Sequence, residues 1–138
     1  MSIYDIVPSC FLFTFNRGFA KIENNMQKIL KHLSEKEAIA IQEFKQKVKS
    51  RFSLVALKLF GSKARGDYNK YSDIDVLLVM KNPSSKEELE IHAIAVDILL
   101  KYEIDLSVKI FSEKEYKKLN SIPTIFMRFI QKEGVSFL

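Results

Sequence analysis

Two aspartates separated by one residue, Asp73 and Asp75, begin an apolar stretch that runs to Met80. In a β-strand, side chains at positions i and i+2 lie on the same face, about 6.5–7 Å apart along the strand. Two carboxylates on one face repel each other unless a cation lies between them. Hard oxygen ligands of this kind suit Mg²⁺, which also keeps waters and binds substrate phosphates. The spacing therefore predicts that Asp73 and Asp75 bind Mg²⁺.

A turn that contains glycine precedes this acidic pair. Gly61 and Ser62 follow an apolar segment and begin the sequence Gly-Ser-Lys-Ala-Arg-Gly. Glycine lets a phosphate approach the backbone, and the N–H groups that follow it favour negative charge. The Ser62 hydroxyl is a further donor, and Lys63 and Arg65 are candidates for contact with phosphate. Arg65 is equally suited to a structural pair with Asp67.

These residues need a scaffold, and the sequence predicts one from capping boxes and hydrophobic periodicity. The order α-β-β-α-β-α-α is typical of an α/β domain with a small mixed sheet flanked by helices. The predicted strands cover 54–60, 73–80 and 104–111. The predicted helices cover about 35–52, 86–101 and 113–119, with a last helix from Pro123 to Gly134.

A third acidic residue, Asp105, lies near the start of the third predicted strand. If the first two strands are antiparallel and the helix over 86–101 is a crossover, the third strand runs parallel to the second. Asp105 then arrives at the same sheet edge as Asp73 and Asp75. A charge among apolar strand residues is costly without a function or a partner. A salt bridge to a neighbouring lysine is the alternative explanation for Asp105.

Three carboxylates beside a phosphate-binding turn indicate phosphoryl or nucleotidyl transfer. Two metal ions about 3.5–4 Å apart can stabilise both the attacking and the leaving oxygen of an in-line displacement. Taken singly, the parts have ordinary explanations: Gly61 and Ser62 form a strand-ending turn, Asp73 is a cap, and Asp75 is a surface strand residue. The full set at this spacing favours the functional interpretation.

The motif resembles that of a known superfamily. Gly61-Ser62, ten further residues, and then Asp73-Ile74-Asp75 are similar to the Gly-Ser-x10-Asp-x-Asp signature of DNA polymerase beta-like nucleotidyltransferases. The fuller string, Gly-Ser-x-Ala-Arg-Gly through Ser-Asp-Ile-Asp, resembles the minimal nucleotidyltransferase (MNT) subgroup. The resemblance covers about residues 35–138 and implies a fold like the polymerase beta palm.

The resemblance also implies a role for each site residue. Gly61 and Ser62 would hold the triphosphate of ATP or another nucleoside triphosphate. Asp73 and Asp75 would bind two Mg²⁺ ions, and Asp105 would complete the catalytic metal site and orient the attacking hydroxyl. Lys63 stands where arginine is common in the family.

Many MNT proteins are antitoxins paired with a HEPN toxin, a small helical ribonuclease. The implied reaction is transfer of AMP from ATP to a toxin tyrosine with release of pyrophosphate. One alternative is a non-catalytic module that binds a nucleotide or the toxin. Another is transfer to a small molecule such as an aminoglycoside, which usually requires an additional helical domain.

The composition sets broad limits. The chain has 138 residues, 47% of them hydrophobic, a net charge of +5, one cysteine and two histidines. These numbers predict one cytoplasmic domain without disulfides or a zinc site, and they permit nucleic-acid binding without requiring it. No apolar run reaches the ~20 residues of a membrane helix. We divide the chain into an N-terminal extension, 1–25, and a nucleotidyltransferase domain, 26–138; the extension is either an apolar arm or sequence upstream of a natural start at Met26.

Overall fold

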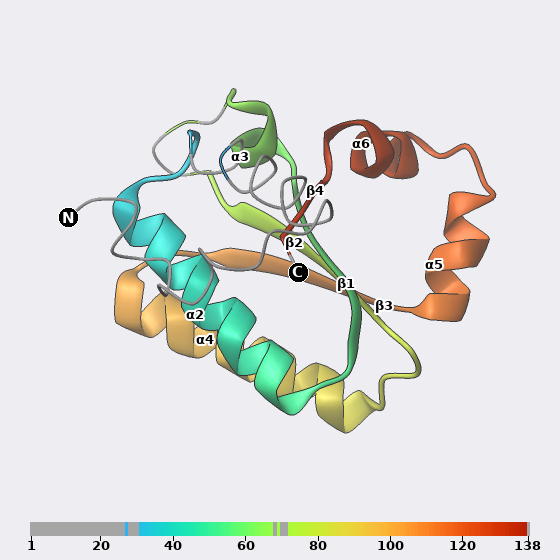
Figure 1. Ribbon diagram of the computed structural model, residues 1–138, viewed down its shortest axis with the longest axis horizontal. Coiled ribbons are helices and arrows are strands. Elements are labelled where there is room, and N and C mark those ends of the chain that lie inside the picture. Colours follow the sequence, from blue (N-terminus) through green and yellow to red (C-terminus); the bar gives the residue numbers. More distant parts are fainter. Residues whose placement is uncertain (1–26, 28–30, 68, 70–71, 138) are drawn as a thin grey trace, which may run out of the picture.

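The computed structural model describes residue 27 and residues 31–67, 69 and 72–137. The predictions for residues 1–25 and for a start at Met26 lie outside these residues. Figure 1 shows a twisted central sheet with helices on both faces. None of the helices in the described part of the chain combines the length and the apolar character needed to cross a membrane.

The sheet has four strands in the order β3-β2-β1-β4. Strand β2 pairs antiparallel with β1 and parallel with β3, as the sequence predicted. The short strand β4 pairs antiparallel with β1 at its other edge. The strands are β1 (Leu54–Phe60), β2 (Ile74–Met80), β3 (Leu106–Ser112) and β4 (Val135–Ser136). The predicted small mixed α/β sheet is therefore confirmed.

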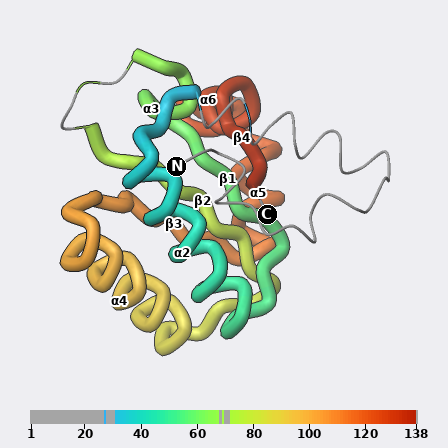
Figure 2. The backbone as a smooth tube through the Cα atoms, turned by 60° about the vertical axis from the view of Figure 1, so that its left-hand side comes forward, coloured from blue at the N-terminus to red at the C-terminus, as the bar shows by residue number. Residues whose placement is uncertain are grey.

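Helices cover the two faces of the sheet unequally (Figure 1). Two long helices, α2 and α4, lie side by side on one face, as Figure 2 also shows. The shorter α5 and α6 lie on the opposite face, and α3 directly follows β1. The helices are α2 (Glu35–Arg51), α3 (Ser62–Arg65), α4 (Ser85–Tyr102), α5 (Glu113–Asn120) and α6 (Ile125–Glu133).

Local capping explains where most helices begin. Ser34, Ser84 and Ser112 each form a capping box with a glutamate three residues later, which satisfies two otherwise unpaired N–H groups. The last helix begins later than predicted, because the Thr124 side chain accepts the N–H of Met127 and leaves Pro123 outside the helix. Gly134 caps this helix as expected.

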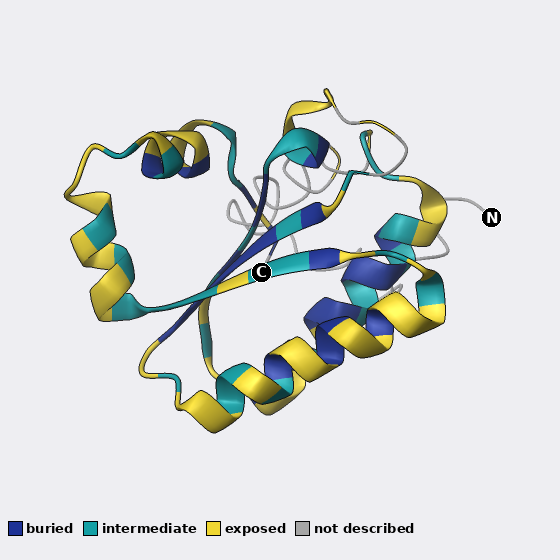
Figure 3. Ribbon diagram, turned by 180° about the vertical axis from the view of Figure 1, so that it is seen from behind, coloured by how far each residue is buried: buried dark blue, intermediate teal, exposed yellow. Residues whose placement is uncertain are grey.

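The two faces of β2 belong to different hydrophobic clusters. Ile74, Val76 and Leu78 join the core under α2 and α4, whereas Leu77 packs with Phe60 and α6. Strands that are buried on both faces have continuous apolar sequences, and Figure 3 shows the central strands as mostly buried. We call the face of the sheet that packs against α2 and α4 the α2/α4 face, and the opposite face the α5/α6 face. Among the residues of β2, only Asp75 is not fully buried.

An ion-pair cluster around Glu43 joins α2 to α4. Its carboxylate accepts hydrogen bonds from Tyr102 and from Lys101 at 2.9 Å, and it lies 3.0 Å from the Lys47 ammonium. These contacts, led by the one from Tyr102, lower the pKa of Glu43 from 4.5 to about 2. A lowered carboxyl pKa stabilises the folded state above pH 4.5, and this stabilisation is lost as the pH falls toward 2.

We expect Glu43→Gln to lower the free energy of unfolding at pH 7 by about 1–2 kcal/mol, after allowance for solvent screening. The difference from wild type should shrink as the pH falls from 4.5 toward 2. Urea denaturation across this pH range measures both effects, with Glu90→Gln on the neighbouring helix α4 as the control. A difference that stays constant with pH would show that the Glu43 charge does not contribute.

Candidate functional site

The strand register brings the predicted acidic residues to one edge of the sheet. Asp75 pairs with Phe60, the last residue of β1. Ile74 pairs with Leu106, and the Ile74 N–H donates to the Asp105 carbonyl at 3.1 Å. Asp73 and Asp105 directly precede β2 and β3, so they lie at the same end of these two parallel strands. The structure therefore places the backbones of the three acidic residues at one edge of the sheet, as the sequence predicted.

The Asp75 carboxylate lies directly against Gly61. A Cβ atom added to Gly61 would lie 2.1 Å from Oδ2 of Asp75, far inside contact distance. Gly61 also has φ of +78°, a backbone conformation that side chains disfavour. Two features therefore require glycine at this position: the positive φ of the backbone and the close approach of the Asp75 carboxylate. The structure therefore places the glycine turn next to Asp75.

The electrostatic environment of Asp75 favours an added cation. Its pKa is raised, first by burial and then by the negative charge of Asp73. Lys109, Arg65 and a hydrogen bond from the Ser107 side chain act in the opposite direction. Asp75 and Asp73 are therefore close enough to repel each other, and a cation between them would relieve this repulsion.

The donor set fits Mg²⁺, although the third ligand is not in place. Two carboxylates with room for water and substrate phosphates are the ligands that Mg²⁺ commonly takes. Within the described part of the chain, no group of three or more His, Cys, Asp or Glu side chains is placed to hold one ion. The chemistry of Asp73 and Asp75 suits a metal, and metal binding by these two residues and by Asp105 stays a prediction.

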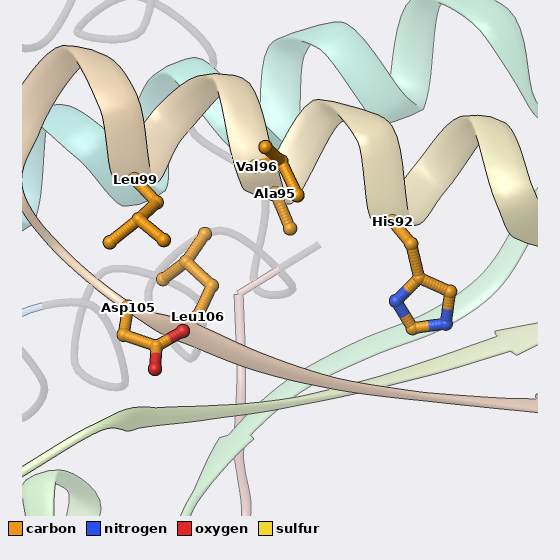
Figure 4. Close-up of a pocket in the computed structure, with 6 residues that line it drawn as sticks. All are labelled: His92, Ala95, Val96, Leu99, Asp105 and Leu106. Carbon is orange, nitrogen blue, oxygen red and sulfur yellow. The ribbon is translucent and has the colours of Figure 1, made fainter.

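Asp105 lines a hollow beside α4 (Figure 4). The hollow is about 140 Å³ and is otherwise lined by His92, Ala95, Val96, Leu99 and Leu106. In Figure 4 the Asp105 carboxylate extends away from Val96 and Leu99. Ligand pockets usually measure at least about 300 Å³, so this hollow is too small for a nucleotide. The Asp105 carboxylate forms no hydrogen bond or ion pair with any residue the structure describes, so a salt bridge does not explain it there.

Lys63 is buried and paired. Its ammonium lies 2.7 Å from Oε1 of Glu37, and only 5% of its side chain is exposed. Glu37 also accepts the N–H of Ser34 in the capping box of α2. This ion pair therefore joins α3 to the first turn of α2. The sequence predicted a phosphate contact for Lys63, and such a contact would require its ammonium to leave Glu37.

Arg65 lies at the surface and is held by two acids. Its guanidinium contacts both Asp67 oxygens at 3.1 Å and Oε2 of Glu133 at 3.0 Å, and it lies over the Phe129 ring at 5.9 Å. The structural pairing with Asp67 that the sequence left open is present. The pairing with Glu133 was missed, because these residues are 68 positions apart in the chain.

Two further side chains of β3, Ser107 and Lys109, were not predicted as part of the site. Ser107 pairs in register with Asp75, and Lys109 follows two residues later. Since β-strand side chains alternate, both lie on the α5/α6 face together with Asp75. Every second residue of a strand lies on the same face, so the alternation that starts at Asp105 would have identified Ser107 and Lys109.

Comparisons with known proteins identify relatives of this chain. A family model described as a nucleotidyltransferase domain matches residues 41–130. A protein of Methanocaldococcus jannaschii named putative protein adenylyltransferase is 41% identical over 98 residues, which cover 69% of this chain and 92% of that protein. Another of the same description and organism is 34% identical over 100 residues, covering 71% and 94%. A crystal structure of a putative nucleotidyltransferase from Sulfolobus solfataricus covers 85% of this chain and 86% of its own, with 24% identity and a TM-score of 0.45.

Proposed function

Because the chain belongs to the nucleotidyltransferase family, we propose that it transfers AMP from ATP to a hydroxyl group of a partner protein. The observation that carries this proposal is the Asp75 carboxylate lying against Gly61 with the charge of Asp73 beside it. An acidic pair next to a glycine turn suits a nucleotide whose phosphates need both hydrogen-bond donors and charge neutralisation. The names of the two relatives support a protein as the acceptor.

In this reaction the acceptor hydroxyl attacks the α-phosphorus of ATP. A new bond forms between the acceptor oxygen and that phosphorus, the bond to the bridging oxygen breaks, and pyrophosphate leaves. We assign Gly61 and Ser62 to the triphosphate. Asp73 and Asp75 would hold Mg²⁺, with Asp105 as the third ligand and as the group that orients the hydroxyl and receives its proton. Two bound Mg²⁺ ions would supply neutralisation of the charge that develops on the phosphate oxygens.

For the acceptor, we propose a tyrosine of a HEPN-type toxin, which would make this protein an antitoxin of the cytoplasm. The similarity of the sequence from Gly61 through Asp75 to the MNT subgroup supports this assignment. Helix α6 carries two exposed apolar residues, Ile125 and Phe129. Phe129 lies next to Arg65, so these residues give a protein partner a surface near the site.

The test is incubation of the protein and the product of its neighbouring gene with ATP labelled at the α or the γ phosphate. We expect label from the α position alone on the partner, pyrophosphate in solution, and loss of the reaction with a chelator. Mass spectrometry should locate AMP on a tyrosine. Label from the γ position would indicate a kinase instead. Neutralisation of the partner without any label would indicate a non-catalytic binding module, and label on an aminoglycoside alone would indicate a small-molecule acceptor.

A further inference from the structure

The cations nearest the site are almost all engaged by other side chains. Lys63 pairs with Glu37, and Arg65 pairs with Asp67 and Glu133. Lys58 lies on the α5/α6 face opposite Leu77, where its ammonium is 3.3 Å from the Tyr116 hydroxyl and 5.8 Å from the centre of that ring. Each of these three cations must break an existing contact before it can bind a phosphate.

Lys109 differs from these three cations. It pairs in register with Leu77 on β2, two residues beyond Ser107, which pairs with Asp75. Its strand neighbours Val108 and Ile110 pack into the core of the α2/α4 face, so the Lys109 side chain extends from the opposite face, where Asp75 lies. It is exposed, and none of the residues that the structure describes forms an ion pair or hydrogen bond with its ammonium.

We propose that Lys109 is the cation that binds the phosphate oxygens of the nucleotide beside Asp75, while Lys63 and Arg65 hold the glycine turn in position. This inference rests on the proposed function. A triphosphate arriving at the turn brings several negative charges close to carboxylates that already repel each other. An exposed ammonium on a flexible stem, with three donors and no bond to break, is well suited to meet it.

The electrostatics of the site agree with this placement. The positive charge of Lys109 already acts on Asp75, since it is among the causes that lower the pKa of that carboxyl against burial and Asp73. The ammonium is therefore close enough to act on Asp75 before any nucleotide arrives. The competing role for Lys109 is a contact with an acidic residue of the acceptor protein, which would not change the binding of ATP alone.

The test compares the affinity for ATP and for adenosine, measured by calorimetric titration with Mg²⁺ and without any acceptor. Lys109→Gln should weaken ATP binding by about tenfold, as expected for loss of a charge-assisted hydrogen bond, and leave adenosine binding unchanged. Lys109→Arg should keep most of the ATP affinity. Lys81→Gln is the matched control, because Lys81 is also exposed and follows the far end of β2.

Each other outcome has a distinct meaning. If the wild type binds ATP and Lys109→Gln binds it equally well, the Lys109 inference is wrong and the proposed function stands. If Lys109→Gln keeps its affinity for ATP and the AMP-transfer assay gives it a higher KM for the acceptor, Lys109 belongs to the contact with the partner protein and the inference is overturned. Equal losses for ATP and adenosine would make Lys109 a structural residue. If the wild type binds no nucleoside triphosphate, both proposals fail.

Discussion

Replacement of Asp75 by asparagine should lower the rate of AMP transfer by at least about a thousandfold, because it removes one of the two carboxylates that would hold the metal. The protein should remain folded. The folded state raises the pKa of Asp75 above its ordinary value of 3.8. The charged carboxylate is thus a cost to folding that appears as the pH rises through the folded pKa. Asparagine removes this cost.

We therefore expect the Tm of Asp75→Asn at pH 7 to equal or exceed that of the wild type, while activity is lost. Addition of Mg²⁺ with ATP should raise the Tm of the wild type, since a ligand that binds only the folded state stabilises it. It should raise the Tm of the variant much less. Asp97→Asn, at an exposed position on α4, is the control and should behave as the wild type. Full activity of Asp75→Asn would refute the metal assignment.

The loss of activity and the gain of stability are expected to arise from one cause. A carboxylate that is half-buried beside another carboxylate is unfavourable in the free protein, and the same arrangement is what a divalent cation requires. Asp75 also interrupts an otherwise fully buried strand. Local violations of the rules of folding often mark functional sites, and at this position the sequence pattern and the structure agree.

Most of the fold could be predicted because its signals are local. Ser34 and Ser112 carry capping boxes within four residues, and the apolar run before Gly61 predicted the strand with the bounds that β1 has. The antiparallel and parallel pairings followed from element order and the crossover rule. The strand β4 was missed, because two residues carry no periodicity and are ordered only by pairing with β1.

The pairing of charges in the site could not be predicted in the same way. Nothing near Lys63 in the sequence indicates Glu37, which is 26 residues away and on another helix. Sequence spacing therefore identified the acidic pair, whose geometry depends on one strand. It assigned the cations less well, because their partners depend on how α2 and α6 pack around the turn.

The second prediction of large effect concerns Gly61. We expect Gly61→Ala to lower the rate of AMP transfer by about a hundredfold or more and the free energy of unfolding by about 1–3 kcal/mol. The methyl group would meet Oδ2 of Asp75 at 2.1 Å, so the carboxylate must move away from the turn. At φ of +78° the backbone is strained for alanine as well. Transfer of labelled AMP and chemical denaturation measure the two effects.

Gly66→Ala separates the strain from the displaced carboxylate. Gly66 has φ of +90°, so alanine is strained there too, but its methyl group would approach the His32 ring at 2.6 Å rather than a site aspartate. A side-chain ring can shift, and Asp75 keeps its position. We therefore expect Gly66→Ala to lose stability and to retain most of its activity at temperatures where it is folded. If both variants lose activity equally, strain in the turn is decisive, and the close approach of Asp75 to Gly61 is not what the reaction requires.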